Sequence, residues 1–325
     1  MIRFNAAVLT SCDTARPFSD SRPLQWREIS ADGPGDGEVM VRITAASLCR
    51  SDLSVVTGIR AWPMPIVPGH EAAGIVETVG SGVSRVRPGD QVVLVYQPAC
   101  GTCPCCRAGE VHLCQPGLAA NRAGKLLSGG PRLSLDGQAV YHHMGLSAFA
   151  EMAVVSEHSL VRVDADLPAE IAALLGCAVM CGAGTVQNTL GLRAGETLVI
   201  AGIGGVGSSA LLGAMAAGAG RIIAVDPDPG KLETAKSLGA SDVVLDGPDT
   251  VAEILELTSG GSDCVGGGRR AWRICNGFWR IAAWRADGQC RAGRSGHAVF
   301  PGRGGAGDWR QDCQRQLYGQ LQSAA

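Results

Sequence analysis

Four closely spaced cysteines constrain the folding of this chain most strongly. They are Cys100, Cys103, Cys106 and Cys114, separated by two, two and seven residues. Thiolates at this spacing can close tetrahedrally around one Zn²⁺ at about 2.3 Å each and leave no open coordination position. The pattern predicts a structural zinc site, and the alternative is a group of scattered buried cysteines. Cys105 stands beside a predicted ligand and is expected to be a spare thiol.

Composition places the chain among soluble, metal-binding proteins. Its 325 residues suffice for two domains, and the net charge of −2 gives no reason to expect nucleic acid or an anionic membrane. The sequence lacks a secretory start and a run of about 18 uninterrupted apolar residues, so we expect a cytoplasmic protein without a transmembrane span. In such a reducing compartment, 13 cysteines indicate metal binding or catalysis rather than disulfides.

Two structural patterns follow one another along the chain. Residues 1 to about 160 show short β segments broken by Gly and Pro, which predict an all-β barrel-like unit with irregular lobes over 100–147. From Pro168 onward, helices and strands alternate, which predicts a parallel sheet with right-handed crossovers. The strands are expected at 197–202, 221–226 and 242–246, with another beginning at 262–265, and the helices at 206–219, 231–240 and 250–260.

A glycine-rich turn lies between the first strand and helix of the alternating region. It has the form G-x-G-x-x-G, and Asp226 ends the next strand 19 residues past the last glycine. This context predicts a dinucleotide site whose pyrophosphate rests on the helix N-terminus, and a structural turn is the alternative. Asp226 would accept hydrogen bonds from ribose hydroxyls and repel a 2′-phosphate, which favours NAD over NADP. The cofactor-binding stretch comprises Gly202, Gly204, Gly205, Val206 and Gly207.

A third group of residues is scattered along the sequence. Cys49, His70 and Cys177 could hold a zinc ion with one position left open, as catalytic zinc sites do. The alternative is that His70 is a satisfied core histidine and Cys177 an ordinary core residue.

The sequence resembles the zinc-containing medium-chain alcohol dehydrogenases. The resemblance is carried by GHEAAGIVETVGSGVSRVRPGDQVV, by CGTCPCCRAGEVHLC, and by AGIGGVG followed by RIIAVD, and it runs from about residue 5 to about residue 264. It is closest to the NAD-linked branch with the liver-type and glutathione-dependent formaldehyde enzymes. It implies an α/β protein with an all-β domain: a GroES-like barrel catalytic domain and a Rossmann doubly wound parallel sheet.

The resemblance also implies residue roles. Cys49, His70 and Cys177 would bind the catalytic zinc. Glu71 would lie behind it as an alternate carboxylate, and Asp52 would fix the His70 tautomer. The remaining implied roles are substrate hydrogen bonding and the start of a proton relay for Ser51, pyrophosphate binding for Arg50, ribose contact for Lys231, and lining of the substrate pocket for Tyr96.

One position departs from the family pattern. Liver-type enzymes pass the proton to a histidine three residues after the hydroxyl, where this chain has Ser54, which is no base near neutral pH. The relay would then leave through water or another residue. We expect His142 and His143 to be solvated loop histidines. Cys181 is expected either to perturb the pocket or to be a bystander.

The implied function is zinc-dependent alcohol oxidation. Hydride would pass from a zinc-bound alkoxide to NAD⁺, or back to an aldehyde, with a primary alcohol or a hydroxymethyl-thiol adduct as substrate. The expected partners are this small molecule and, from the family, a homodimer or homotetramer, with neither nucleic acid nor membrane. The alternative is a catalytically inactive zinc-binding remnant.

The C-terminal part of the sequence differs from the rest. Residues 265–325 carry ten arginines, three aspartates and no lysine or glutamate, and hold four of the six tryptophans. Only six are Val, Ile or Leu, and no strand period is visible. Codons for Asp308 to Ala325 can be chosen whose next frame reads TGAKTVKGSYMGSCNP, resembling a K-T-x-x-G-S-x-x-G stretch of the family.

Three interpretations of this tail compete. It is a frameshifted translation, a basic tail for an anionic partner, or a divergent half-domain, and we favour the frameshift. The predicted domains are a GroES-like zinc-binding catalytic domain over 1–165, a partial Rossmann NAD-binding domain over 166–264, and an aberrant Arg/Gly/Trp-rich tail over 265–325. Loss of the later strands would also remove the family's dimer-forming residues.

Overall fold

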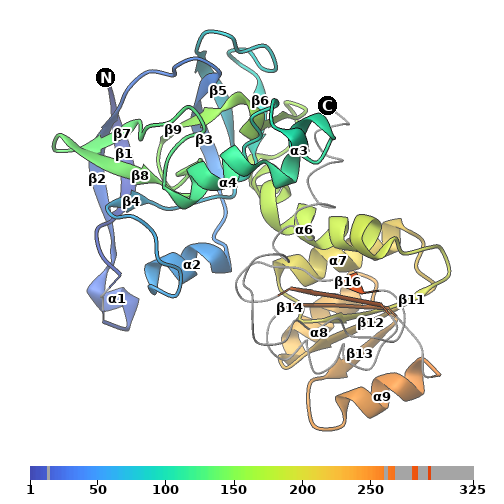
Figure 1. Ribbon diagram of the computed structural model, residues 1–325. Helices are drawn as coiled ribbons and strands as arrows, with labels where there is room; N and C mark the ends of the chain where they lie inside the picture. Colours follow the sequence, from blue (N-terminus) through green and yellow to red (C-terminus); the bar gives the residue numbers. More distant parts are fainter. Residues whose placement is uncertain (13–14, 260–262, 268–279, 285–291, 294–325) are drawn as a thin grey trace. The chain divides into compact units, whose positions relative to one another are not determined.

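The computed structural model describes residues 1–12, 15–259, 263–267, 280–284 and 292–293 (Figure 1). Its described residues form two compact units, one ending at Cys177 and the other beginning at Ala178. This division falls later than the predicted domain boundary at 165/166. That boundary, and the extent of the tail, remain predictions.

The first unit contains a closed barrel and a second sheet, as the short alternating segments predict. Strands β1, β2, β7, β8 and β4 close the barrel in that order, and only the β4–β8 pair is parallel. Strands β10, β6, β5, β3 and β9 form the antiparallel sheet. The bounds are β1 (Ile2–Leu9), β2 (Leu24–Ala31), β3 (Glu38–Ala46), β4 (Ile66–Val67), β5 (Ala72–Val79), β6 (Gln91–Leu94), β7 (Leu133–Leu135), β8 (Gln138–His142), β9 (Met152–Ser156) and β10 (Leu160–Arg162).

Apolar side chains fill both parts of this unit because inward-facing residues alternate along the strands. Phe4, Val8 and Ile29 pack inside the barrel with Met40 and Leu133. The second sheet has its own buried cluster. The helices of the unit are α1 (Phe18–Ser21), α2 (Arg50–Val56), α3 (Pro104–Arg107), η1 (Val111–Leu113), α4 (Gln115–Arg122), η2 (Glu157–Ser159) and α5 (Ala169–Leu174).

The segment 100–147 is more regular than the sequence predicts. It contains α3, α4 and the β7–β8 hairpin, which supplies two strands of the closed barrel. The expectation of irregular lobes is therefore wrong for these elements. Each is short, and Cys, Gly and Pro interrupt the hydrophobic periodicity that would have revealed it.

The second unit is built on a parallel sheet, as the strand–helix alternation predicts. Strands β13, β12, β11 and β14 run parallel in that order. Leu198, Ile200 and Ile222 pack on the side of α7 and α8, whereas Val199 and Ile223 pack on the side of α9. Both faces are thus covered. The bounds are η3 (Leu175–Val179, reaching across the division between the units), α6 (Met180–Gly184), η4 (Thr185–Leu190), β11 (Thr197–Ala201), α7 (Gly205–Ala216), β12 (Arg221–Asp226), α8 (Pro229–Ser237), β13 (Asp242–Leu245), α9 (Thr250–Leu257) and β14 (Asp263–Gly267).

Two strands continue this sheet inside the C-terminal tail. β15 (Arg280–Trp284) pairs in parallel with β14, and β16 (Ala292–Gly293) pairs antiparallel with β15. The sequence of residues 265–325 shows no strand period, so these two strands were not predicted. Backbone pairing does not require the alternation of apolar and polar side chains by which a sequence predicts a strand. The rest of the tail, on which the frameshift hypothesis depends, lies outside the described residues.

One long apolar helical stretch runs from Ala169 to Leu190 through α5, η3, α6 and η4. By length and composition alone it could cross a membrane, with a mean hydropathy of 1.7 in its best window. Half of that window is buried inside the protein. Burial of this kind is typical of a core helix, and the stretch is weak evidence for a membrane span.

Candidate functional site

Cys49 and Asp52 are fixed by the start of α2. Cys49 is the N-cap residue, and its backbone N–H donates to Asp52 Oδ2 at 3.0 Å. Such a capping box satisfies backbone donors that the first helical turn leaves unpaired. Asp52 is buried, so this local sequence holds a carboxylate inside the protein beside the Cys49 thiol. Ser51, between them, is half-buried, and Arg50 is exposed.

His70 is placed by the turn that leads into β5. Gly69 adopts a φ of +98°, and a Cβ there would lie 2.5 Å from the Phe149 backbone nitrogen, so only glycine fits. The next residue, His70, is buried, and its Nδ1 lies 2.8 Å from Asp52 Oδ1. Because a carboxylate only accepts hydrogen bonds, Nδ1 carries the proton and Nε2 keeps its lone pair for a metal.

Cys177 comes from a π-helical turn, η3. This geometry is rare and is frequent at functional sites. Gly176 lets the turn approach β6, since a Cβ there would collide with the Leu94 carbonyl oxygen. Cys177 Sγ consequently lies 3.6 Å from His70 Nε2. A tetrahedral zinc with one sulfur and one nitrogen ligand needs these atoms about 3.5 Å apart, from bonds of about 2.3 and 2.0 Å.

The structure therefore brings the scattered residues together. Ligand atoms of Cys49, His70, Glu71 and Cys177 all lie within 4.8 Å of one another. Two sulfurs, one imidazole and a nearby carboxylate fit zinc by donor type and by spacing. Tyr96 faces the same histidine edge-on, with ring centroids 5.5 Å apart.

Protonation in this cluster follows from its burial and contacts. The neighbouring Cys177 thiol, then burial, raise the pKa of Cys49 far above its usual value. Burial acts to raise the pKa of Asp52, but contacts with His143 and His70 outweigh it and hold that pKa well below normal. Burial acts to lower the pKa of His70, yet Asp52 and Cys49 raise it to about 10. A metal cation would displace the Nε2 proton of His70 and the protons of the thiols, while His70 Nδ1 keeps its hydrogen toward Asp52.

His142 and His143 are buried, so the expectation of solvated loop histidines is wrong. His142 ends β8, and its Nε2 accepts the backbone N–H of Arg132 at 3.1 Å. His143 Nδ1 lies 3.2 Å from Asp52 Oδ1. The β7–β8 hairpin, which ends at His142 directly before His143, forms part of the closed barrel, and the sequence did not predict it. The Ser54 hydroxyl donates to the Arg50 carbonyl oxygen one helical turn earlier, at 2.9 Å. A serine inside a helix commonly makes this bond to its own helix.

The second metal candidate is the cysteine lobe. Sulfur atoms of Cys100, Cys103, Cys106 and Cys114 lie within 4.8 Å of one another, and Cys105 is outside this set. Cys100 and Cys106 Sγ are 4.0 Å apart, close to the edge of about 3.8 Å of a tetrahedral site with 2.3 Å zinc–sulfur bonds. This fit supports a closed four-sulfur zinc site.

Backbone groups in the lobe point at the sulfurs. Cys114 Sγ accepts the N–H groups of Cys100 at 3.2 Å and Gly117 at 3.4 Å, and Cys100 Sγ accepts that of Cys103 at 3.3 Å. Burial acts to raise the pKa of Cys100, but hydrogen bonds from Thr102 and Cys103 lower it to about 6. These donors stabilise thiolate, the form that binds zinc.

The glycine-rich turn, residues 202–207, joins β11 to α7. Part of its backbone borders open space, and this stretch is called the cradle below. A Cβ on Gly207 would collide with the Gly202 carbonyl oxygen, so this glycine is required by chain packing. A Cβ on Gly204 would meet nothing within 4 Å, and Gly205 would meet only Ala178 at 3.5 Å. Gly204 precedes α7 and Gly205 is its first residue. Unpaired backbone N–H groups at this helix N-terminus favour an anion. This space fits a dinucleotide pyrophosphate.

Asp226 lies at the end of β12, beside this turn. Its Oδ2 accepts the Ile203 N–H at 2.7 Å, and its Oδ1 accepts the Asp228 N–H at 3.0 Å. Lys231 Nζ lies 3.8 Å from Oδ2. A buried, oriented carboxylate next to the cradle is the group that a cofactor ribose needs.

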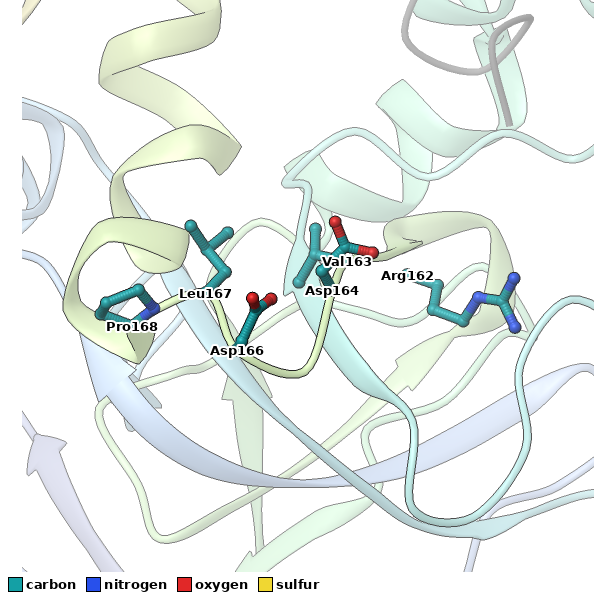
Figure 2. Close-up of a pocket in the computed structure, with 6 residues that line it drawn as sticks. All are labelled: Arg162, Val163, Asp164, Asp166, Leu167 and Pro168. Carbon is teal, nitrogen blue, oxygen red and sulfur yellow. The ribbon is translucent and has the colours of Figure 1, made fainter.

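A shallow depression in the first unit is unrelated to these clusters. Figure 2 shows its lining by Arg162, Val163, Asp164, Asp166, Leu167 and Pro168. None of the cysteines or histidines named above lines it. Val163 and Leu167 belong to the apolar packing around β5 and β6, so the depression is a surface feature of that junction.

Comparison with known proteins identifies the family. Residues 35–165 match the alcohol dehydrogenase GroES-like domain, and residues 205–266 match the zinc-binding dehydrogenase family. A putative alcohol dehydrogenase D of Mycobacterium tuberculosis is 45% identical over 249 residues, which are 76% of this chain and 67% of that protein. S-(hydroxymethyl)glutathione dehydrogenase of Synechocystis sp. is 37% identical over 298 residues, which are 89% of this chain and 77% of that protein.

Solved structures agree with the sequence matches. Benzyl alcohol dehydrogenase from Acinetobacter calcoaceticus superposes with a TM-score of 0.74 at 34% identity, over 82% of this chain and 71% of that one. The chain belongs to the zinc-containing medium-chain alcohol dehydrogenases. The predicted fold class, a GroES-like barrel domain with a Rossmann sheet, is thereby confirmed.

Proposed function

We propose that this chain is a zinc- and NAD-dependent alcohol dehydrogenase acting on a primary alcohol or a hydroxymethyl-thiol adduct. The observation that carries the proposal is the convergence of Cys49, His70 and Cys177 at zinc spacing beside the buried Asp52. The names of the relatives support an alcohol as the substrate class. From the family we further propose that this protein is cytoplasmic and forms a homodimer or a homotetramer.

Each residue of the cluster has a separate role in the proposed reaction. Bound zinc would supply a Lewis acid that lowers the pKa of an alcohol, and bound NAD would accept the hydride. Asp52 holds His70 with its lone pair toward the metal, and Glu71 offers a nearby carboxylate. Ser51 hydrogen-bonds the substrate oxygen and takes its proton toward solvent. Because Ser54 is no base, that proton leaves through water.

The cofactor is held by the second unit. Gly202, Gly204, Gly205, Val206 and Gly207 form the pyrophosphate cradle. Asp226 and Lys231 contact the adenosine ribose, and the family pattern gives Arg50 the role of pyrophosphate binding. Four sulfurs of the lobe hold a structural zinc. We assign residues 1–165 to catalysis, 166–264 to NAD binding and 265–325 to the aberrant tail.

An alcohol carrying deuterium on its carbinol carbon tests the reaction directly. Benzyl alcohol labelled in this way should transfer deuterium to the nicotinamide ring, detected by mass spectrometry of the reduced cofactor. Deuterium found only in the solvent would contradict direct hydride transfer. Absence of any reduced cofactor, across benzyl alcohol, ethanol and hydroxymethylglutathione, would favour the rival proposal of an inactive zinc-binding remnant.

The remnant remains a second candidate because of the tail composition. Ten arginines and only six Val, Ile or Leu residues among the last 61 favour a lost reading frame near Val265. Sequencing the gene decides this point. An alternative frame closed by early stop codons beyond codon 265 would rule the frameshift out.

The cradle gives a matched pair of variants. Gly204→Ala should leave the free energy of unfolding within about 1 kcal/mol of wild type, because space is open there, yet weaken NAD binding at least about tenfold by filling the cradle. Gly207→Ala should instead destabilise the protein by about 1–3 kcal/mol through its clash with Gly202. Calorimetric NAD titration and denaturant unfolding measure both. Unchanged NAD affinity in Gly204→Ala would contradict the assignment.

A further inference from the structure

The Tyr96 ring lies beside the metal-ligand cluster, just after β6 has ended. Its centroid is 5.5 Å from that of the His70 ring, and the two planes are 89° apart. The tyrosine side chain is half-buried, whereas His70 is buried. The family resemblance gives Tyr96 a place in the wall of the substrate pocket. Whatever fixes this residue therefore bears on the shape of that pocket.

A side chain from α4 holds the main chain of Tyr96. Asn121 Nδ2 lies 2.8 Å from the Tyr96 carbonyl oxygen. Because a carbonyl oxygen only accepts hydrogen bonds, the amide nitrogen is the donor. Asn121 is 7% exposed, so this hydrogen bond is shielded from solvent on the side of the helix.

The helix that carries Asn121 is itself fixed at both ends. In its first turn, a Cβ on Gly117 would collide with the carbonyl oxygen of Pro98, so α4 packs directly against the chain two residues past the tyrosine. Beyond its last turn, the carbonyl oxygen of Gly124 accepts the His142 N–H at 2.8 Å. The amide of Asn121 is therefore presented to the tyrosine at a set position.

Helix stability does not explain an asparagine at this position. Asparagine forms helices less well than alanine or leucine. The Oδ1 atom of Asn121 is also buried without a hydrogen-bond partner among the described residues, which costs free energy. A leucine of similar volume would remove both disadvantages, but it could not donate to the Tyr96 carbonyl oxygen.

We infer that Asn121 is a positioning residue, which holds Tyr96 against His70 so that the tyrosine ring forms a fixed wall for the alcohol. This inference rests on the proposed function, because that function makes Tyr96 part of the substrate pocket. Asn121 takes no part in the chemical step and acts only through the tyrosine.

Fluorine NMR of the zinc-loaded full chain tests this placement without any turnover. The chain has three tyrosines, so 3-fluorotyrosine gives few signals, and Tyr96→Phe assigns the relevant one. Asn121→Leu should shift or broaden the Tyr96 signal. Arg122→Ala is the matched control at the next, exposed position of α4 and should leave the signal unchanged. A Tyr96 signal in Asn121→Leu that coincides with that of wild type overturns the inference.

Kinetics separate an effect on the pocket from general damage. Asn121→Leu should raise the KM for benzyl alcohol at least about fivefold, the size of one lost hydrogen bond. It should leave kcat within about threefold, because a pocket wall contributes equally to binding of the ground state and the transition state. Arg122→Ala should match wild type in both constants. A shifted Tyr96 signal with an unchanged KM would also overturn the inference.

Asn121→Asp adds a test by pH and decides the matter if Asn121→Leu does not fold. A carboxylate cannot donate, whereas a protonated carboxyl group donates its O–H. Burial raises the pKa of such a carboxyl group. The KM of this variant, relative to wild type at the same pH, should therefore be at least about fivefold higher at about pH 8.5 and within about twofold at about pH 5.5. A ratio that does not change with pH overturns the inference. If wild type oxidises no alcohol, the proposed function fails, and the Tyr96 fluorine signal of Asn121→Asp at the two pH values still decides the role of Asn121.

Discussion

Cys177→Ala is expected to lower the zinc content from two ions per chain to one and the turnover number at least about a thousandfold. The variant removes one of three ligands at the open site and leaves the four-sulfur lobe intact. A thousandfold loss corresponds to about 4 kcal/mol in the activation barrier, a reasonable size for lost Lewis-acid stabilisation. Zinc is measured by atomic emission and turnover by NADH formation from benzyl alcohol.

Cys181→Ala is the matched control for this prediction. Cys181 is also buried, lies four residues further along the same helical stretch, and belongs to neither ligand set. It should keep both zinc ions and most of the activity, with the modest loss of stability that a small cavity causes. Equal zinc loss in the two variants would show that Cys177 acts through packing and would remove it from the ligand set.

Cys103→Ala is expected to remove the other zinc ion and to destabilise the protein by about 3–5 kcal/mol. Structural zinc contributes its binding free energy to folding, and three remaining sulfurs hold the ion poorly. Cys103 is also the N-cap of α3, so the segment from Cys100 to Cys114 should become sensitive to limited proteolysis. Denaturant unfolding and zinc analysis measure the effect.

Cys105→Ala controls for the loss of a thiol in the same helix. Cys105 lies in α3 but outside the four-sulfur set. Its replacement should retain both zinc ions and change the free energy of unfolding by less than about 1 kcal/mol. Full zinc content in Cys103→Ala would refute the structural site, whatever its stability.

The sequence predicts the regular parts of this fold well because periodicity is strong there. Strand β12 coincides with the predicted 221–226, and β11, α7 and β13 lie within a few residues of their predicted positions. The α4 helix and the β7–β8 hairpin escaped prediction, since Cys, Gly and Pro obscure their pattern. Short elements of this kind are stabilised by closing the barrel, which a local pattern does not encode.

The candidate site was predictable to a similar degree. Spacing alone indicates the cysteine lobe and the glycine-rich turn. Uniting Cys49 with His70 and Cys177 needed the family resemblance, because these residues are far apart in the chain and a π-helical turn carries one of them. His143 was misjudged as solvated. Only the tertiary structure reveals that His143, one residue past β8, is buried beside Asp52.

Zinc content and NADH formation, measured on one preparation of the full chain, test the central claim most directly. The account predicts two zinc ions per chain and NADH formation that depends on added alcohol and on NAD. Two zinc ions with no NADH formed from benzyl alcohol, ethanol or hydroxymethylglutathione would contradict it and identify the chain as an inactive zinc-binding remnant.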